Sequence, residues 1–489
     1  MFTNMKNIYQ VILLVSILMM SSCGKSFIER RPVSSVTIDV LYKTDKDFQD
    51  AVIGAYQGLR NQYANMWQFG DLRSDDAWIQ VSNQPSSTAV DVFSINSSDA
   101  LLNSTWANYY IAINRANNIL TKIESADVSI VRNKDRYIGE AKFLRAIAYF
   151  DLVRIFGDVQ LITNVPTAEE VLITGRTAAA TIYANLIIPD LLDASAKLPL
   201  VYTGTEVGRA TKGAAKAMLG KVYMTIKDFV KAEALLQEIT LAPHTYSLLV
   251  NYNDLFDYSK NEHHSEYIFD IEYEEGLGGL GSTFTNNFMP NVTALLNYYN
   301  IKGGFGESIS PTTQFVNAWQ AGDKRKEVSV QCCGSWKNPS TGVVTTFNST
   351  TSQSYTMKYI TSVAVNGDSK ANWKVIRYAD VLLMYAEALN ENGKTTAALL
   401  PLNQVRARAG LAAYTGLTQV QFRDNVAQER RFELSFEGHR WFDLLRTGKA
   451  LAACAPVGMR DYMTVFPVPL SQVKVMNNPT LFPQNAGYN

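Results

Sequence analysis

Residues 135–156 are apolar on almost every side, and this run constrains the fold more than any other part of the sequence. Gly157 and Asp158 follow it directly, as is typical of a helix end. A surface helix keeps one polar face, whereas this segment carries large apolar side chains at nearly every helical angle: Phe143, Leu144, Ile147, Tyr149, Phe150, Leu152, Val153 and Ile155. Such a helix has to be covered by others. The sequence therefore predicts a layered helical body.

Other segments have the spacing of amphipathic helices. The first begins at Thr44, whose hydroxyl can cap it, with Asp47 three residues later and apolar side chains following at helical intervals. Similar patterns cover residues 106–123 and 177–198. Residues 211–240 read as two helices joined by a turn at Lys227 and Asp228. We therefore expect a mostly α-helical fold.

One helical pair is repeated further along the chain. Small and large residues alternate in the first copy as they do in tetratricopeptide units, where small side chains let paired helices approach each other. The equivalent positions are Ala217, Gly220, Tyr223 and Ala232 in the first copy, and Leu382, Tyr385, Ala388 and Ala397 in the second, which has Asn392-Gly393 as its turn. Two aligned copies predict tetratricopeptide-like hairpins stacked in a right-handed array.

The character of the chain changes between the two copies. Residues 241–374 carry strand-like pieces at 267–273 and 355–364, glycine-rich runs at 276–281 and 302–306, and a Ser/Thr-rich stretch at 335–354. We interpret this region as an irregular, loop-rich lobe with short β-strands. It separates an N-terminal helical-repeat part, residues 39–240, from a C-terminal helical part and closing segment, residues 375–489. A rigid body that presents a loop-built face is typical of binding proteins.

The first 23 residues have the organisation of a lipoprotein signal. Lys6 precedes an apolar stretch at 11–20 that is too short to span a bilayer, and Ser21-Ser22 stands directly before Cys23. We interpret residues 1–22 as a signal peptide, Cys23 as the lipidated residue, and residues 23–38 as a tether. The alternative is an ordinary cleavage site beside an unrelated cysteine. No later segment is long and uncharged enough to span a membrane, so contact with the membrane is expected through the lipid anchor only.

Charge and cysteine content exclude several classes of function. The chain has 45 basic and 45 acidic residues, which argues against binding to nucleic acid. Its four cysteines form no disulfide framework. Cys332 and Cys333 are adjacent and form either a vicinal disulfide or two free thiols, and Cys454 stands alone. The four histidines lack zinc-site spacing, and we predict no metal or cofactor.

Carboxylates at regular spacing are the strongest candidates for catalysis. Glu429, Glu433 and Glu437 recur every four residues on a helix predicted over 425–445, and with Asp76 they could serve glycoside hydrolysis. That chemistry needs two carboxyl groups on opposite sides of a cleft, whereas a single row lies on one surface. Nearby cations explain the row as charge pairing: Arg430, Arg431, Arg440 and Arg446.

Two further groups of ionisable residues have the same structural interpretation. Asp380 and Glu387 lie on a strongly apolar helix, where we expect them to be buried partners of arginines such as Arg377 or Arg406. His439 has aromatic and ionic neighbours and is expected to be packed and hydrogen-bonded. We therefore predict that the protein is not an enzyme.

Aromatic residues in loops are the best candidates for ligand contacts. Tyrosine and tryptophan combine a flat apolar ring with a polar group, which suits stacking on a ligand at a wet surface. The predicted ligand-binding residues are Trp67, Trp78 and Asp76 around the segment 71–76, and Tyr298, Tyr299 and Trp336 in the lobe. Trp319 lies on an apolar helical pattern with Phe315, and we expect it in the core.

Several strings closely resemble one family. They are residues 140–158, 377–389, 402–410 and 429–444, together with 466–469 and 484–488 near the end. They resemble the SusD/RagB-type nutrient-binding lipoproteins of the Bacteroidetes, and the resemblance runs from Cys23 to the C-terminus. Two features depart from the family pattern: Ala486 stands where proline is usual, and the leader carries Lys25, Arg30 and Arg31 where acidic residues are usual.

The resemblance implies a fold and a role. The fold would be tetratricopeptide-type helical hairpins with an irregular ligand-binding lobe, as the residues also indicate. The role would be capture of a glycan, or of peptides in some members, on the outer face of the outer membrane. The protein would act as a lid on a SusC-like TonB-dependent transporter. A purely structural subunit of that complex is a further alternative. The shared strings belong to the scaffold, so no ligand residue is carried over.

Overall fold

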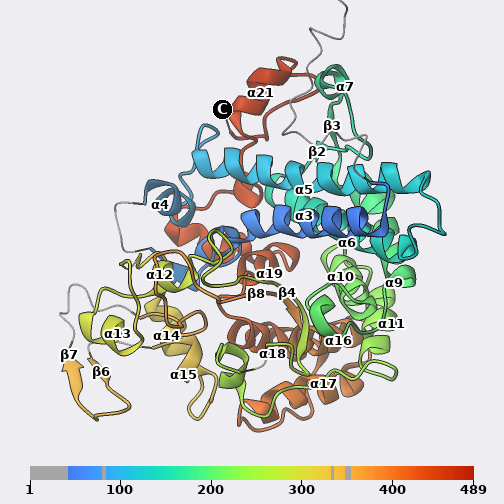
Figure 1. Cartoon of the computed structure of the whole chain (residues 1–489). Helices are drawn as coiled ribbons and strands as arrows, with labels where there is room; N and C mark the ends of the chain where they lie inside the picture. Colours follow the sequence, from blue (N-terminus) through green and yellow to red (C-terminus); the bar gives the residue numbers. More distant parts are fainter. Residues whose placement is uncertain are drawn as a thin grey trace, which may run out of the picture.

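The computed structural model describes residues 42–79, 84–260, 262–304, 306–331, 335–346 and 354–488. The predicted signal peptide (1–22), the tether (23–38) with Cys23, and the pair Cys332-Cys333 lie outside the described residues. Figure 1 shows long helices across the upper part and the right side of the molecule, with a loop-rich region at the lower left.

Three long helices build the N-terminal layer. Helix α3 (Asp45–Tyr63) packs side by side with α5 (Ala100–Glu124) and α6 (Lys134–Phe156), and α3 and α5 run alongside each other in Figure 1. Thr44 and Asp47 form the predicted capping box at the start of α3. Helix α6 is buried on nearly all sides, as predicted, and ends at Gly157, whose φ is +73°. Helix α5 begins six residues before the predicted boundary because the Asp99 side chain accepts a hydrogen bond from Leu101 N at its first turn.

The single helix predicted over 177–198 is wrong in detail. The segment forms α8 (Ala179–Ile182), a π-helical turn η2 (Tyr183–Ile187) and α9 (Ile188–Lys197). Pro189 lies in the first turn of α9 and has no amide hydrogen to donate to the preceding turn. The wider π turn accommodates this break without ending the helical path.

The two predicted hairpins are present and pack together. The first consists of α10 (Lys212–Thr225) and α11 (Phe229–Ile239), and the second of α16 (Tyr378–Glu391) and α17 (Thr395–Arg408). Helix α11 packs against α16, so the hairpins are neighbours although the loop-rich region separates them in the sequence (Figure 1). Gly220 faces Leu236 across the first hairpin, where a larger residue would collide with it. The fold is mostly α-helical and tetratricopeptide-like, as predicted.

Short strands and short helices occur in the region between the hairpins, and one of these strands, β5, pairs with β1 of the N-terminal part. The antiparallel pairs are β1 (Ala77–Trp78) with β5 (Ser310–Pro311), β4 (Tyr267–Ile271) with β8 (Trp373–Arg377), and β6 (Ser335–Lys337) with β7 (Val344–Thr346). The short helices are α12 (Phe284–Phe288), α13 (Thr293–Tyr298), α14 (Thr313–Ala318) and α15 (Lys326–Ser329). The division at 241 and 374 stays a prediction.

The strand predicted over 355–364 is wrong. Only Tyr355 and Val363 form isolated bridges, and a turn occupies residues 358–359. The Lys358 side chain reaches Glu437, while the Tyr359 ring stacks on Trp373 in the core. Because these neighbouring side chains have different distant partners, the backbone turns where local alternation indicates an extended strand.

The helix predicted over 425–445 is also wrong. Helix α18 (Gln419–Glu433) ends before Leu434, and α19 (Arg440–Arg446) begins a new helix. In the connecting turn Phe436 and Gly438 have φ values of +60° and +80°, which a continuous helix does not allow. Glu437 therefore lies in this turn and not on the helical face that Glu429 and Glu433 share.

The remaining elements are short. They are η1 (Gln68–Leu72), α4 (Pro85–Asp91), β2 (Val159–Gln160), α7 (Ala168–Ile173), β3 (Arg176–Thr177), η3 (Gly204–Glu206), η4 (Tyr252–Phe256), α20 (Ala450–Cys454), η5 (Ala455–Val457), η6 (Asp461–Thr464) and α21 (Leu470–Met476). Strands β2 and β3 pair with each other.

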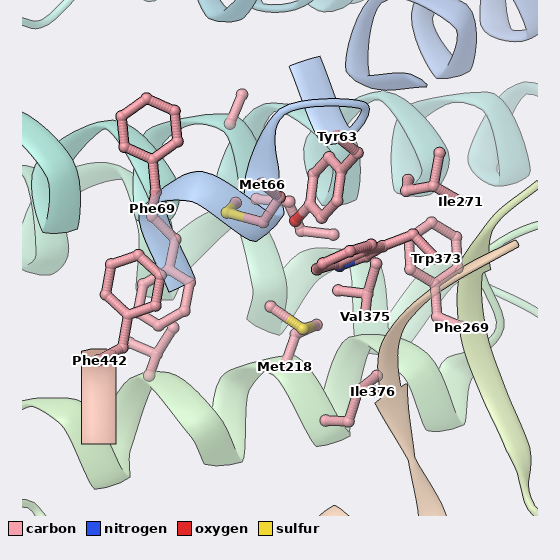
Figure 2. Packing of buried hydrophobic residues seen from close by; sticks show 14 of the residues in the cluster. Tyr63, Met66, Phe69, Met218, Phe269, Ile271, Trp373, Val375, Ile376 and Phe442 are labelled. Carbon is pink, nitrogen blue, oxygen red and sulfur yellow. The ribbon is translucent and has the colours of Figure 1, made fainter. Parts of the chain in front are cut away.

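One large hydrophobic core joins the helical layers to the central strands. Figure 2 shows the Trp373 ring of β8 among side chains from α3, α10 and β4, including Tyr63, Met218 and Phe269. A second, smaller cluster lies within the loop-rich lobe: Met289, Leu295, Ile301, Trp336, Tyr355, Ile360 and Val363. We call this second cluster the lobe core. It gives the lobe packing of its own.

Candidate functional site

Three of the predicted ligand-binding aromatics come together in the lobe. Tyr298 closes α13, Tyr299 follows it, and Trp336 is the central residue of β6. The ring centroids of Tyr298 and Tyr299 are 4.8 Å apart with planes at 89°, and those of Tyr298 and Trp336 are 5.2 Å apart at 61°. We call these three residues the aromatic group. Tyr298 is the most exposed member, at 37%.

The lobe core holds the aromatic group in place. Trp336 is itself a member of that core, and the Tyr299 ring packs against it. Burial raises the pKa of Tyr299 to about 12, so its hydroxyl keeps its proton and remains a hydrogen-bond donor. A supported cluster of this kind presents the exposed Tyr298 ring in a fixed orientation. Such a surface can stack on a flat apolar face of a ligand.

Trp78 lies on a different pair of strands. It is 38% exposed on β1, opposite Ser310 of β5. Next to it, Ile79 N donates a hydrogen bond of 3.0 Å to the Asp91 carboxylate, whose pKa burial raises to about 6. Within the part of the chain that the structure describes, no ring contact joins Trp78 to the aromatic group. Trp78 is therefore a separate exposed ring on the loop-built face.

Trp67 and Asp76 lie behind the surface. Trp67 is 3% exposed, its indole N–H donates to Ala64 O, and its ring packs edge-on against Phe288. Asp76 is 4% exposed and forms ion pairs with Arg431 and Arg440. Their assignment as ligand contacts stays a prediction. In the conformation described, neither side chain offers a ligand an accessible face.

The three glutamates considered for catalysis belong to a buried charge network. Its members are almost fully covered, and each forms at least one ion pair within the set. The cations are Arg325, Lys358, Arg377, Arg406 and Arg408, and the anions are Glu266, Asp323, Glu429, Glu433 and Glu437. Equal numbers of opposite charges explain how the set tolerates burial. Charge pairing of these glutamates is confirmed, but the cations predicted for it are wrong. Arg430, Arg431, Arg440 and Arg446 pair instead with aspartates and with Glu387: Asp75, Asp76, Asp380 and Asp443.

Acid is expected to weaken the fold through this network. The neighbouring Arg377 and Lys358 charges outweigh desolvation and lower the pKa of Glu437 from 4.5 to about 2. A carboxyl group with a depressed folded pKa stabilises fully above its unfolded pKa, and that contribution is lost as pH falls through the folded pKa. We predict that the free energy of unfolding, measured by urea titration, drops by about 3 kcal/mol between pH 4.5 and 2 through Glu437.

Glu437→Gln is the variant that isolates this contribution. Asp71 acts in the opposite direction, because burial raises its pKa well above the ordinary value. The comparison is therefore between the pH slopes of wild type and variant, each with Asp71 intact. The Gln variant should have the flatter profile below pH 4.5. Parallel profiles would show that Glu437 does not titrate as described.

The predicted partners of Asp380 and Glu387 are wrong, although their burial as ion pairs is confirmed. Asp380 pairs with Arg430 and Lys221, and Glu387 pairs with Arg446, rather than with Arg377 or Arg406. Arg377 and Arg406 point into the charge network instead. His439 is buried as predicted, with its Nδ1 3.2 Å from Lys221 Nζ. Trp319 is in the core beside Phe315, as expected.

The part of the chain that the structure describes has neither a group of metal ligands nor a helix that could span a membrane. No group of three or more His, Cys, Asp or Glu side chains there could hold a metal ion. None of the described helices combines the length and the apolar character that crossing a bilayer requires.

One feature of the structure has no signal in the sequence. A pocket of about 430 Å³ lies between α3, the segment 205–209, β4 and Leu280. Its lining residues come from three distant parts of the chain, 53–60, 205–209 and 270–280, and form no motif. The nearest pattern in the sequence is the glycine-rich run at 276–281.

Comparisons with known proteins agree on one family. The profile described as "SusD family" matches residues 256–484, and the profile described as "Starch-binding associating with outer membrane" matches residues 26–224. The chain is 27% identical to SusD-like protein P2 of Formosa agariphila over 96% of this chain and 98% of that protein. It is 24% identical to a SusD-like protein of Bacteroides ovatus over 89% of this chain and 81% of that protein.

Solved structures give the same answer for the fold. A laminarin-binding SusD-like protein superimposes with a TM-score of 0.79 at 28% identity, covering 91% of this chain and all of that one. Surface glycan-binding protein A from Bacteroides thetaiotaomicron, solved with laminarihexaose, has a TM-score of 0.75 at 22% identity, with 91% of this chain and 100% of that one covered. At the latter identity the likeness concerns the fold alone.

Proposed function

The chain belongs to the SusD/RagB family, and on that premise we propose that it is a cell-surface lipoprotein that captures oligosaccharides. The observation that carries the proposal is the aromatic group, in which an exposed tyrosine ring is braced by Trp336 and the lobe core. Sugar rings have flat C–H faces that stack on aromatic rings, while their hydroxyls need hydrogen-bond partners at a wet surface. A partly exposed tyrosine that is held in place offers its ring for stacking and its hydroxyl for hydrogen bonds.

One exposed ring decides how the aromatic group would meet a glycan. Tyr298 is 37% exposed and Trp336 is 8% exposed, so a sugar unit of the chain would stack on the Tyr298 ring while Trp336 supports that ring. The relative that shares 28% identity is a laminarin-binding protein. Laminarin oligosaccharides are therefore the first ligands to test.

The proposed partner is a SusC-like TonB-dependent transporter in the outer membrane. Cys23 would carry the lipid, and the tether at 23–38 would keep the protein near the transporter. A lipoprotein with two or more acyl chains is held stably on a membrane, whereas one chain gives marginal binding. The protein would hold the glycan, and the partner would supply the energy for transport.

Three alternatives remain distinct from this proposal. A peptide-binding member of the same family would use the same face with another ligand. A glycoside hydrolase would need two accessible carboxyl groups, but Glu429, Glu433, Glu437 and Asp76 are buried and ion-paired. A purely structural subunit would bind no ligand and would only stabilise the transporter complex.

Replacing Tyr298 with alanine is expected to weaken oligosaccharide binding. Aromatic stacking contributes about 0.5–1.5 kcal/mol beyond buried area, so the dissociation constant should rise about 2- to 12-fold. Isothermal titration calorimetry against a glycan panel that includes laminarihexaose would measure the change. The result follows from the position of Tyr298 as the most exposed member of the aromatic group.

Tyr385→Ala is the matched control. Tyr385 is a partly exposed tyrosine of α16, on the second hairpin and outside the lobe. This variant should bind the glycan as wild type does. A wild-type protein that binds no oligosaccharide, alone or with its transporter, would overturn the proposal. Binding of peptides but not glycans would favour the peptide alternative.

A further inference from the structure

A pocket separate from the aromatic group is built mainly on α3 and β4. The α3 wall carries Ile53, Tyr56, Gln57 and Arg60, the side chains of one helical face. The facing wall is the end of β4 with Asp270, Ile271 and Glu272; Val207, Gly208 and Leu280 close the sides. Its volume of about 430 Å³ is within the range of small-molecule sites.

The Glu272 carboxylate, a hydrogen-bond acceptor in the pocket, is held in place by neighbouring residues. Glu272 Oε1 lies 2.6 Å from His263 Nε2 and accepts a hydrogen bond of 3.3 Å from the Tyr267 hydroxyl. Gly208 has φ +99°, and its lack of a side chain lets the Glu272 carboxylate lie directly against the backbone. Because these contacts fix the carboxylate, it needs little reordering to accept hydrogen bonds from a ligand.

The α3 wall carries hydrogen-bond donors of the pocket. Arg60 donates a hydrogen bond of 3.4 Å to Gly279 O, and among the described residues it has no ion pair. The Tyr56 hydroxyl accepts from Ala210 N at 2.9 Å, which fixes its partly exposed ring. A guanidinium group, an amide from Gln57 and an aromatic face thus line one wall, opposite the carboxylate.

The charges of the pocket balance. Two acids, Asp270 and Glu272, and two arginines, Arg60 and Arg209, line it. Asp270 is paired with Lys374, and Arg209 with Glu140 and Glu206. A ligand with a net charge would meet like charge on one wall. A neutral ligand with many hydroxyls, which donate to carboxylates and accept from arginine and amide groups, suits both walls.

The glycine-rich run at 276–281 forms the rim. Gly276, Gly278 and Gly279 all have positive φ, and a side chain at any of them would meet open space. Leu280 contributes to the pocket wall, and Arg60 links α3 to Gly279. The base of the loop is fixed by Gly276 N, which donates to Asp368 at 2.8 Å. The glycine-rich run therefore forms the border of the pocket.

We propose that this pocket is a second carbohydrate site, which takes a single neutral sugar unit. The inference rests on the proposed function, because it assumes that the protein meets glycans. The aromatic group would hold a stretch of a chain on an open surface, whereas the pocket, which opens to solvent, would receive one unit and contact its hydroxyls.

The test compares variants of the two sites by saturation-transfer NMR. The probes are methyl glycosides of glucose, galactose, mannose, xylose and N-acetylglucosamine. Arg60→Ala removes the guanidinium donor, which forms no ion pair among the described residues, and Ile53→Trp, at a residue of the α3 wall that is 51% exposed, fills the pocket. We expect each to weaken binding of the accepted glycoside at least tenfold. Ile111→Trp is the matched control, since Ile111 is 44% exposed on α5 and lies outside the pocket.

The other outcomes separate the two proposals. Glycoside binding that is lost in Tyr298→Ala but kept in both pocket variants would overturn the second site and leave the proposed function standing. The second site is also ruled out, and the proposed function stands, if wild type binds oligosaccharides but none of the glycosides. If free amino acids compete for the pocket in place of sugars, its assignment to carbohydrate is wrong. If neither glycosides nor oligosaccharides bind wild type, the proposed function itself fails.

Discussion

Arg377→Met is expected to lower the free energy of unfolding by about 3–5 kcal/mol, because it leaves buried carboxylates without their main cation. Arg377 is 1% exposed and forms ion pairs with Glu266, Glu433 and Glu437. Its guanidinium also donates to Glu433 O. Methionine fills similar space but donates no hydrogen bond. Urea-induced unfolding followed by circular dichroism would measure the loss.

Arg423→Met provides the matched control for the same chemical change. Arg423 lies on α18 and pairs with Glu391, but 44% of its side chain is exposed. Water replaces a lost partner at such a site, so the expected change is within about 1 kcal/mol. If the two variants lost equal stability, the charge network would not carry the weight that its burial indicates.

Some features of the fold could be predicted from the sequence because they depend on local patterns. A helix that is apolar on all sides, such as α6, can only be buried, and the small residues of α10 favour a close neighbour. These inferences depend on periodicity within one element. The capping box at Thr44 and the two hairpins follow from equally local signals.

Features that depend on distant partners could not be predicted. The pattern at Glu429, Glu433 and Glu437 suggested one helix, yet the chain turns at Phe436 so that Glu437 meets Lys358 and Arg377. The partners of Asp380 and Glu387 were misassigned for the same reason, since spacing on one helix does not say which arginine faces it.

The sequence predicted one part of the candidate site and missed another. The loop positions of Tyr298, Tyr299 and Trp336 predicted exposed aromatics. The structure brings these three together, but only Tyr298 is exposed, since Trp336 is buried in the lobe core. Trp67 has the same kind of sequence context but packs on Phe288, a residue that no local pattern connects to it. The pocket bordered by Glu272 and Arg60 was missed because tertiary contacts alone assemble it.

The second large effect is expected at Gly70, where two distant backbones touch. Gly70 lies in the π-helical turn η1, and a Cβ there would come within 3.0 Å of the Cα, C and O atoms of Gly438. Neither backbone can move away by a side-chain rotation. The contact also positions Gly438 N, which donates to Asp71 at 2.8 Å. Gly70→Ala should therefore cost about 3 kcal/mol of folding free energy, measured by urea titration.

Gly54→Ala is the control that separates crowding from the loss of glycine. Gly54 lies inside α3, and a Cβ there meets nothing within 4 Å. Alanine favours a helix over glycine, so this variant should gain about 0.5–1 kcal/mol. Opposite signs at the two positions would show that the 436–439 turn must press directly on η1. A Gly70→Ala protein as stable as wild type would mean that the turn can retreat, and that the close packing between these two backbones is not required for the fold.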